Sequence, residues 1–382
     1  MSAWRSTPDA SDGLRDVVVV GGGVVGLASA RELARAGARV TVVDPQRADA
    51  RATWAAGGML APLGEAPEPG PFLDLALRSL TLWPDFAREV ESAAERTVGL
   101  HLDGKLLTAA TSAEEVRLDA RRNWLRAEGH AARWVDGAGA RTLEPALSGA
   151  VRAGLLLEGN GRVDNRTLQE ALGDAVRAAG GEVRRGTVVA LLRDRGRACG
   201  VALDRGEALR AAWVVLAAGA WSGGLAGLPR PLPVRPVRGQ MLAFAAPERP
   251  LERVVTSARV YLIPRETADG PVVVVGATSE EVGFDRSVDP AAQTRLASGA
   301  RALVPALVAA PVVERWAGLR PGTPDDLPLL GPDPGTPGLL YATGHYRNGI
   351  LLAPATARAV LGWITGDPPG GMEAFRPDRF GG

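Results

Sequence analysis

The stretch DVVVVGGGVVGLASARELARAGARVTVVD, residues 16–44, restricts the possible folds of this chain more than any other segment. Residues 16–20, apolar from Val17 to Val20, form a short run typical of a parallel strand that is buried on both faces. Residues 24–36 carry the apolar spacing of a helix, and residues 39–43 are typical of a second strand. This order predicts a strand–helix–strand unit of an α/β fold.

Three glycines between the first strand and the helix indicate what this unit binds. Gly21, Gly23 and Gly26 form the pattern G-x-G-x-x-G. The first glycine allows a tight turn, the second lets the backbone approach a pyrophosphate, and the third lets helix and strand pack closely. Asp44 ends the second strand, where a carboxylate can accept hydrogen bonds from a ribose. The motif predicts a dinucleotide, but it does not distinguish FAD from NAD.

Composition excludes several other classes of protein. The chain has 382 residues, 46% of them apolar, and a net charge of +1, so it can bury a large core in two domains or two interleaved lobes. Its basic residues are almost all arginine, Lys105 being the only lysine, and no basic run suggests nucleic-acid binding. The single cysteine, Cys199, and three scattered histidines predict neither a disulfide framework nor a metal site.

Two further segments bear on location. The N-terminus is polar and lacks the apolar region of a signal peptide, so we expect a cytoplasmic protein. Residues 211–228 are uncharged over about the length of a helix, but their glycines favour a buried strand and turn over a membrane span. We therefore expect no membrane association.

Later segments predict elements of two kinds. Ala52–Pro62 is rich in small residues, and its backbone could lie against a flat ligand, although a flexible loop would have the same composition. A helix is expected near residues 165–179, and Trp213–Ala217 is typical of another buried strand. These would share a sheet with the first unit.

The chain between those segments is typical of an antiparallel sheet with flanking helices. Residues 260–278 contain two β-rich runs around Asp269-Gly270, which predicts a hairpin. Asp289-Pro290 predicts the start of a helix. Helices are also expected near residues 73–95 and 113–128, the second with Ser112 and Glu115 at capping-box spacing.

Six motifs, in order along the chain, carry a resemblance to a known family. They are GGGVVG, AAGGML, VVLAAGAWS, GATSEEVGFD, WAGLRPGTPDDLPLLG and GHYRNGILLAPAT. In this order they resemble the glycine oxidase branch of the FAD-dependent D-amino-acid oxidase family. The last two motifs are the most specific, and the resemblance covers nearly the whole chain except the polar N-terminal extension.

The resemblance implies a mixed α/β fold, in which a Rossmann-type FAD-binding lobe is interleaved with an antiparallel-sheet substrate lobe. The FAD lobe would comprise residues 15–60, 150–225 and 325–370, and the substrate lobe residues 61–149 and 226–324. Residues 1–14 would form the N-terminal extension and residues 371–382 a C-terminal tail.

The resemblance also implies which residues contact FAD. The loop GHYRNG would place backbone N–H groups and a helix start against the pyrimidine end of the flavin, where negative charge develops on reduction. Asp44 differs from the family's more frequent glutamate, and a shorter carboxylate should still reach the ribose. With the motif glycines Gly21, Gly23 and Gly26, the implied contacts are Val24, Val25, Asp44, Pro45, Ala52, Thr53, Gly57, Gly58, Met59, Val189, His345, Tyr346, Arg347, Asn348, Gly349, Ile350 and Leu351.

Substrate binding would depend on two arginines and a tyrosine. An amino-acid carboxylate in a dry pocket needs a partner, and a guanidinium offers two parallel hydrogen bonds as well as charge. Arg320 matches the family's carboxylate-binding arginine, Arg347 its second arginine, and Tyr261 the tyrosine that lines the pocket. Ser279 stands where a larger apolar residue is common and Arg259 where one subgroup has histidine, which leaves the substrate range open.

The implied reaction is oxidative deamination of glycine, with hydride transfer to noncovalent FAD, no catalytic acid–base residue, and dioxygen as the acceptor. Sarcosine and small D-amino acids would be further substrates, and the imine would supply the thiazole of thiamine. We also expect a homo-oligomer. A sarcosine oxidase, a D-amino-acid dehydrogenase, and a flavin-binding subunit without catalysis remain as alternatives.

Overall fold

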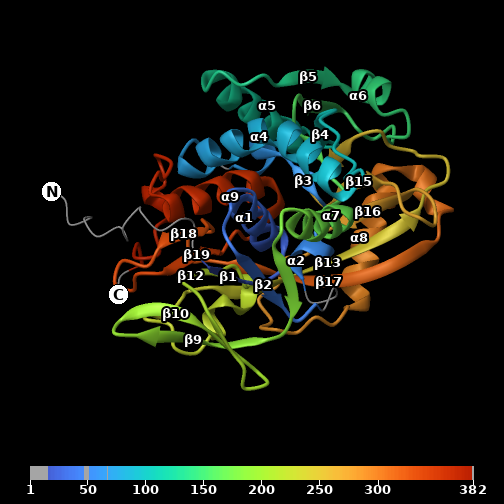
Figure 1. Cartoon of the computed structure of the whole chain (residues 1–382). Helices are drawn as coiled ribbons and strands as arrows, with labels where there is room; N and C mark the ends of the chain where they lie inside the picture. The colour runs from blue at the N-terminus through green and yellow to red at the C-terminus, as the bar shows by residue number, and fades with distance from the viewer. Residues whose placement is uncertain (1–15, 47–50, 67, 381–382) are drawn as a thin grey trace.

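The computed structural model describes residues 16–46, 51–66 and 68–380. Two large sheets contain most of the described strands (Figure 1). The six-stranded sheet has the order β18 (Leu329–Pro332), β19 (Leu339–Thr343), β12 (Trp213–Leu216), β1 (Val17–Val20), β2 (Val40–Asp44) and β8 (Glu182–Arg185). The eight-stranded sheet has the order β17 (Val312–Gly322), β13 (Arg235–Ala245), β16 (Val272–Gly276), β15 (Tyr261–Arg265), β14 (Val254–Thr256), β4 (Lys105–Ala109), β6 (Ala153–Leu157) and β5 (Arg133–Asp136).

The strand–helix–strand unit predicted from the sequence is present at the centre of the six-stranded sheet. β1 pairs in parallel with β2 and with β12, and its four valines are all buried. The edge strand β18 is antiparallel to its neighbour β19, and the other pairings in this sheet are parallel. Because successive side chains of a strand point to opposite faces, Val17 and Val19 join one hydrophobic cluster and Val18 and Val20 another.

Different layers cover the two faces of this sheet. One face packs against α1 (Val24–Arg35), α4 (Pro71–Ala94), α7 (Asn165–Ala178) and α9 (Gly349–Thr365), of which α1, α4 and α9 lie close together in Figure 1. The other face packs against a three-stranded sheet of β9 (Val188–Asp194), β10 (Arg197–Leu203) and β11 (Ala208–Arg210). The segment 211–228 holds β12 and the 3₁₀ helix η2 (Gly219–Gly224), as predicted.

The eight-stranded sheet is antiparallel at every pairing except one. The predicted hairpin is formed by β15 and β16, and α8 (Pro290–Leu303) begins after the Asp289 cap, whose side chain accepts hydrogen bonds from two backbone N–H groups. β14 and β4 pair in parallel, so this sheet is mixed and not purely antiparallel. α8 packs its apolar side chains against the sheet.

The chain passes between the two large sheets several times. It builds β1 and β2 in the six-stranded sheet, β4 to β6 in the eight-stranded one, β8 and β12 in the first again, β13 to β17 in the second, and finally β18 and β19. This order confirms the predicted fold class of two interleaved parts. The remaining elements are α2 (Ala52–Ala55), β3 (Met59–Leu60), α3 (Pro62–Glu65), α6 (Gly137–Leu143), β7 (Gly161–Arg162), η3 (Pro305–Val308) and η4 (Glu373–Phe375), β3 pairing with β7.

One helix begins differently from the prediction. The capping box of α5 (Ser112–Ala127) is formed by Thr111 and Glu114, not by Ser112 and Glu115. Thr111 has the extended conformation of an N-cap and its hydroxyl accepts from the N–H of Glu114 at 3.3 Å, while Ser112 is already helical. Glu115 instead pairs with Arg152 at 3.0 Å. Thr111 is therefore the N-cap residue of this helix.

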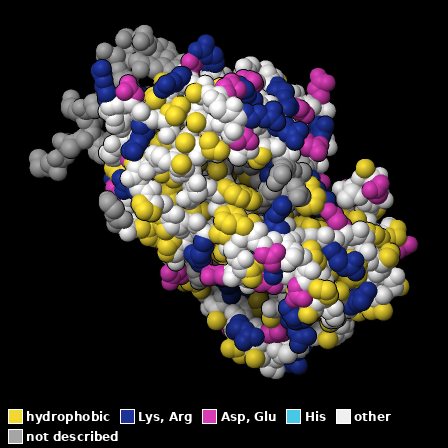
Figure 2. All heavy atoms as spheres, turned by 90° about the horizontal axis from the view of Figure 1, so that it is seen from below, with side chains coloured by type: hydrophobic (Ala, Val, Ile, Leu, Met, Phe, Trp, Pro, Cys, Tyr) yellow, Lys and Arg dark blue, Asp and Glu magenta, His cyan; other side chains and the backbone are white. Residues whose placement is uncertain are grey.

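None of the helices in the described ranges is long and apolar enough to cross a bilayer. On the face of the molecule drawn in Figure 2, basic and acidic side chains are intermingled.

Candidate active site

A cavity of about 1670 Å³ lies between the two large sheets. Its lining includes residues at the carboxyl ends of β1, β2 and β12, the start of α1, and side chains of β13, β15 and β17. Ligands of open α/β sheets bind at this end of the strands. Because typical small-molecule pockets measure roughly 300–1,000 Å³, this cavity has room for a dinucleotide together with a second, smaller molecule.

The three motif glycines have different surroundings. A Cβ atom on Gly21 would lie 2.4 Å from the carbonyl oxygen of Ala217, and one on Gly26 would lie 2.0 Å from the carbonyl oxygen of Gly21. These two glycines are therefore required by the turn and by helix–strand packing. A Cβ atom on Gly23 would have only the Thr53 hydroxyl within 4 Å, at 3.3 Å, so it would project into the cavity. The second glycine leaves space for a ligand.

Asp44 lies beside this loop and is 5% exposed. Its Oδ2 atom accepts a 2.7 Å hydrogen bond from the N–H of Gly22, its Oδ1 atom accepts one of 2.6 Å from the N–H of Gln46, and it forms an ion pair with Arg51. The carboxylate therefore fixes the glycine loop as well as lining the cavity.

The small-residue segment after β2 forms another part of the wall. The Thr53 hydroxyl accepts from the N–H of Val24 at 3.0 Å, at the start of α1. Asn165 holds the segment from α7, donating from Nδ2 to the carbonyl oxygens of Thr53 at 2.6 Å and Trp54 at 3.0 Å. Gly58 has a φ of +80°, and a Cβ there would lie 2.0 Å from the carbonyl oxygen of Val163. These hydrogen bonds and close backbone contacts hold the segment against the cavity.

His345 begins the polar segment before α9 and is 3% exposed. Its Nε2 atom lies 3.0 Å from the Thr356 hydroxyl, and burial lowers its pKa to about 3. The imidazole is therefore neutral at physiological pH. α9 begins at Gly349, and its N-cap residue, Asn348, forms no side-chain capping bond. The positive end of this helix lies at the cavity, which Gly349 and Ile350 line.

Arg320 projects from β17 into the other end of the cavity. Its Nη1 atom donates to the carbonyl oxygens of Thr278 at 3.0 Å and Arg238 at 3.4 Å. Its guanidinium lies against the backbone of Gly239, where a Cβ would come within 2.2 Å of Nη2. In the part of the chain that the structure describes, Arg320 has no carboxylate partner. Its charge is available to an anionic ligand.

Tyr261 and the Tyr346–Arg347 pair complete this end. The Tyr261 ring lies on the backbone of Gly276, where a Cβ would lie 2.3 Å from the phenol oxygen. Burial is the main cause of a raised pKa for Tyr261, so its hydroxyl stays protonated at neutral pH. Arg347 is exposed and donates from Nη2 to the hydroxyl of Tyr346 at 3.2 Å.

The structure brings almost all the implied site residues to one cavity. Gly26, Asn348 and Leu351 do not line it: Gly26 serves packing, Asn348 precedes α9, and the carbonyl oxygen of Leu351 accepts from Ser79 and Trp83. Of the two positions that differ from the family pattern, Ser279 lies beside Tyr346, and Arg259 is exposed and outside the lining. The implied residues in the lining are Gly21, Gly23, Val24, Val25, Asp44, Pro45, Ala52, Thr53, Gly57, Gly58, Met59, Val189, Tyr261, Arg320, His345, Tyr346, Arg347, Gly349 and Ile350.

Sequence reasoning missed several lining residues. Lys105 is 3% exposed and its Nζ atom lies 3.3 Å from Glu65, and both line the cavity. It is the only lysine in the chain, a signal that could have singled it out. Trp221 and Phe284, whose ring centroids lie 5.7 Å apart, also line the cavity, and no spacing in the sequence connects them.

Residues 16–363 match the family described as FAD dependent oxidoreductase. The chain belongs to this family. FAD is therefore its cofactor, and the opening left by Gly23, the carboxylate of Asp44 and the helix starts of α1 and α9 fit that dinucleotide.

Individual members of the family are similar over most of the chain. A glycine oxidase of Pseudomonas aeruginosa is 38% identical, covering 92% of this chain and 95% of that protein. The bifunctional protein ThiO/ThiG of Nostoc is 39% identical over 92% of this chain, which spans 52% of that longer protein. The crystal structure of glycine oxidase from Geobacillus kaustophilus superposes with a TM-score of 0.90 at 32% identity, covering 97% of this chain and 100% of that one.

Proposed function

We propose that this chain oxidises glycine to glyoxylate and ammonia, reducing dioxygen to hydrogen peroxide and consuming one water. The observation that carries the proposal is the guanidinium of Arg320, which faces the cavity without a carboxylate partner among the described residues. A substrate carboxylate would supply that partner through two parallel hydrogen bonds. Similarity to two glycine oxidases supports the same substrate.

The bound cofactor would supply the two-electron acceptor for the hydrogen on the substrate α-carbon. The protein would then contribute orientation and charge, because hydride transfer from a neutral amine requires no acid–base pair. Arg320 would grip the carboxylate, Tyr261 would lie along the substrate, and Arg347 would add a second positive charge. His345, neutral because burial lowers its pKa to about 3, would hold the segment before α9 through Thr356.

The FAD contacts are part of the same proposal. Gly23 and the start of α1 would face the pyrophosphate, Asp44 the ribose, the 52–59 segment the flavin, and Gly349 and Ile350 its pyrimidine end. We also propose that sarcosine and small D-amino acids are secondary substrates, that the imine serves the thiazole of thiamine, and that the protein is a cytoplasmic homo-oligomer. The secondary substrates are supported by the resemblance of the motifs, and the link to thiamine also by the similarity to the bifunctional protein ThiO/ThiG of Nostoc.

A peroxide assay on the FAD-loaded protein tests the reaction. We expect hydrogen peroxide with glycine, and we would compare sarcosine and D-alanine in the same assay. Flavin reduction by glycine without oxygen, but no peroxide when air is admitted, would indicate a dehydrogenase. Absence of flavin reduction with all three amines would favour a non-catalytic flavin-binding subunit.

Acid precipitation tests the mode of attachment. The only cysteine, Cys199, lies on β10 outside the cavity lining, so we expect the flavin to be released into the supernatant. Flavin retained in the pellet would contradict noncovalent binding.

A further inference from the structure

The segment from Thr278 to Asp289 contacts Arg320 directly and Arg347 through Tyr346. The carbonyl oxygen of Thr278 accepts from Arg320 Nη1 at 3.0 Å. The Ser279 hydroxyl lies 3.3 Å from the hydroxyl of Tyr346, which accepts from Arg347 Nη2 at 3.2 Å. This one segment therefore supplies an acceptor to Arg320 and holds the tyrosine that accepts from Arg347.

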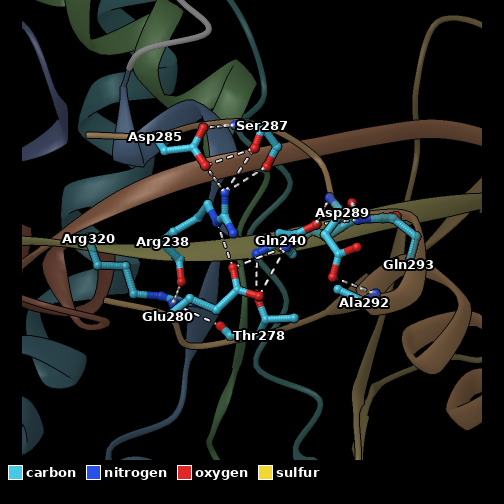
Figure 3. A network of polar contacts seen from close by, with 11 residues as sticks. Arg238, Gln240, Thr278, Glu280, Asp285, Ser287, Asp289, Ala292, Gln293 and Arg320 are labelled. Carbon is cyan, nitrogen blue, oxygen red and sulfur yellow. Dashed lines mark hydrogen bonds and ion pairs between the residues drawn. The ribbon is translucent and has the colours of Figure 1, made fainter. Parts of the chain in front are cut away.

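Two side chains of β13 hold the segment in place, and Figure 3 shows them pointing into the same network. Arg238 donates from Nε to Glu280 at 2.6 Å, forms an ion pair with Asp285, and donates from Nη1 to the carbonyl oxygen of Ser287 at 3.2 Å. It thus binds the beginning and the middle of the segment. Its side chain is only 9% exposed, although Asp285 is half exposed.

Gln240 binds the two ends of the segment. Its backbone N–H donates to the Thr278 hydroxyl at 2.9 Å, and its Nε2 atom donates to Glu280 at 3.0 Å. Its Oε1 atom accepts from the N–H of Asp289 at 2.8 Å. Residues two apart on a strand point to the same face, so Arg238 and Gln240 act together from one side of β13.

The same segment also forms part of the cavity wall. Phe284 packs against Trp221 with ring centroids 5.7 Å apart, and both line the cavity. Neither Arg238 nor Gln240 lines the cavity. Their influence on a substrate must therefore pass through the segment they hold.

We propose that Arg238 and Gln240 are positioning residues for the substrate carboxylate: they fix the segment 278–289, and through it Arg320 and Arg347. The proposal rests on the proposed oxidation of glycine. Freeing the segment would let the Thr278 carbonyl and the Ser279 hydroxyl move, so Arg320 would lose an acceptor and Tyr346, which accepts from Arg347, would lose a neighbour. Substrate binding would weaken while the FAD end of the cavity, built by other elements, stays intact.

The test compares Arg238→Gln with the matched control Arg253→Gln in the FAD-loaded protein. Arg253 also forms a partly buried ion pair, at 2.8 Å from Glu144, and lies outside the cavity lining. For Arg238→Gln we expect faster amide hydrogen exchange across residues 278–289, a KM for glycine about 10- to 100-fold higher, and a smaller change in kcat. The dissociation constant of acetate, followed by the flavin spectrum, should rise in parallel. Arg238→Lys, which keeps one ion pair, should recover part of the loss.

For Arg253→Gln we expect unchanged exchange in that segment and an unchanged KM. Faster exchange in Arg238→Gln with an unchanged KM and acetate affinity would overturn the proposal, as would unchanged exchange. A parallel loss in Arg253→Gln would overturn it too, because general destabilisation would then explain both. If the unaltered protein binds acetate but does not oxidise glycine, the proposed function fails, while the acetate and exchange data still decide the role of Arg238.

Discussion

The guanidinium of Arg265 donates a 2.5 Å hydrogen bond to the Oδ1 atom of Asn165, joining the eight-stranded sheet to the first turn of α7. Arg265 also donates to the carbonyl oxygens of Ala56 at 3.3 Å and Gly57 at 3.4 Å. Burial lowers the pKa of Arg265 to about 10, which still leaves it charged at neutral pH. Through these hydrogen bonds the pair holds the 52–59 segment in place. Neither side chain lines the cavity.

Asn165→Ala should weaken this wall and with it the binding of FAD. The substitution leaves the buried charge of Arg265 without its amide acceptor and removes the donors to Thr53 and Trp54. Each buried group left unsatisfied costs about 1–3 kcal/mol, so the free energy of unfolding should fall by at least about 2 kcal/mol. Urea unfolding and FAD titration measure the two effects. Asn123→Ala, on the exposed surface of α5, is the control, and unchanged FAD affinity in Asn165→Ala would contradict the expectation.

Gly23→Val should lose FAD binding, whereas Gly26→Val should lose folding stability. A side chain at Gly23 meets only the Thr53 hydroxyl within 4 Å, so the variant should fold but bind no FAD. A Cβ at Gly26 would lie 2.0 Å from a backbone oxygen, so that variant should lose stability itself. Circular dichroism, thermal unfolding and flavin absorbance separate the outcomes. A yellow Gly23→Val protein would refute the placement of the dinucleotide.

The buried imidazole of His345 should make stability depend on pH. Burial lowers its pKa from 6.5 to about 3 in the folded protein, so only the unfolded chain takes up its proton as the pH falls below 6.5. The contribution of His345 to the free energy of unfolding is complete above pH 6.5. Below that pH it falls by about 1.4 kcal/mol per pH unit, down to about pH 3. Thermal midpoints at about pH 7.5 and about pH 5.5 should therefore differ less in His345→Gln than in the unaltered protein. An equal pH dependence in both would show that the imidazole is not buried neutral.

The parts of the fold that sequence predicted are those set by local patterns. The run Val17–Val20, the glycine spacing and the apolar face of α1 lie within a few residues of one another, so their periodicity was sufficient. The parallel pairing of β14 with β4 joins residues far apart along the chain, and no local pattern encodes it. The cap of α5 was displaced by one residue because Thr111 and Ser112 offer the same chemistry and only backbone conformation distinguishes them.

For the site, the residues alone predicted the glycine motif and Asp44, and the family resemblance supplied the arginines. Lys105 comes from β4 and Glu65 from α3, and they meet only because both elements border the cavity. The network around Arg238 could not be predicted from the sequence either. Arg238 lies on β13, and β14, β15 and β16 separate it along the chain from its partner Glu280. Such contacts depend on tertiary packing.

Arg320 and Arg347 should respond differently to substitution if they serve the proposed roles. Arg320→Lys keeps the charge but loses the two-pronged geometry, so the KM for glycine should rise about 10- to 100-fold, and Arg320→Ala should be worse. The bound flavin should keep its spectrum in both. Arg347 belongs to the segment before α9, so Arg347→Gln should raise KM and also shift the flavin spectrum. Steady-state kinetics and absorbance spectra of each variant check this division. An Arg320→Lys protein with an unchanged KM would remove Arg320 from the carboxylate site and leave Arg347, which also lines the cavity, as the better candidate.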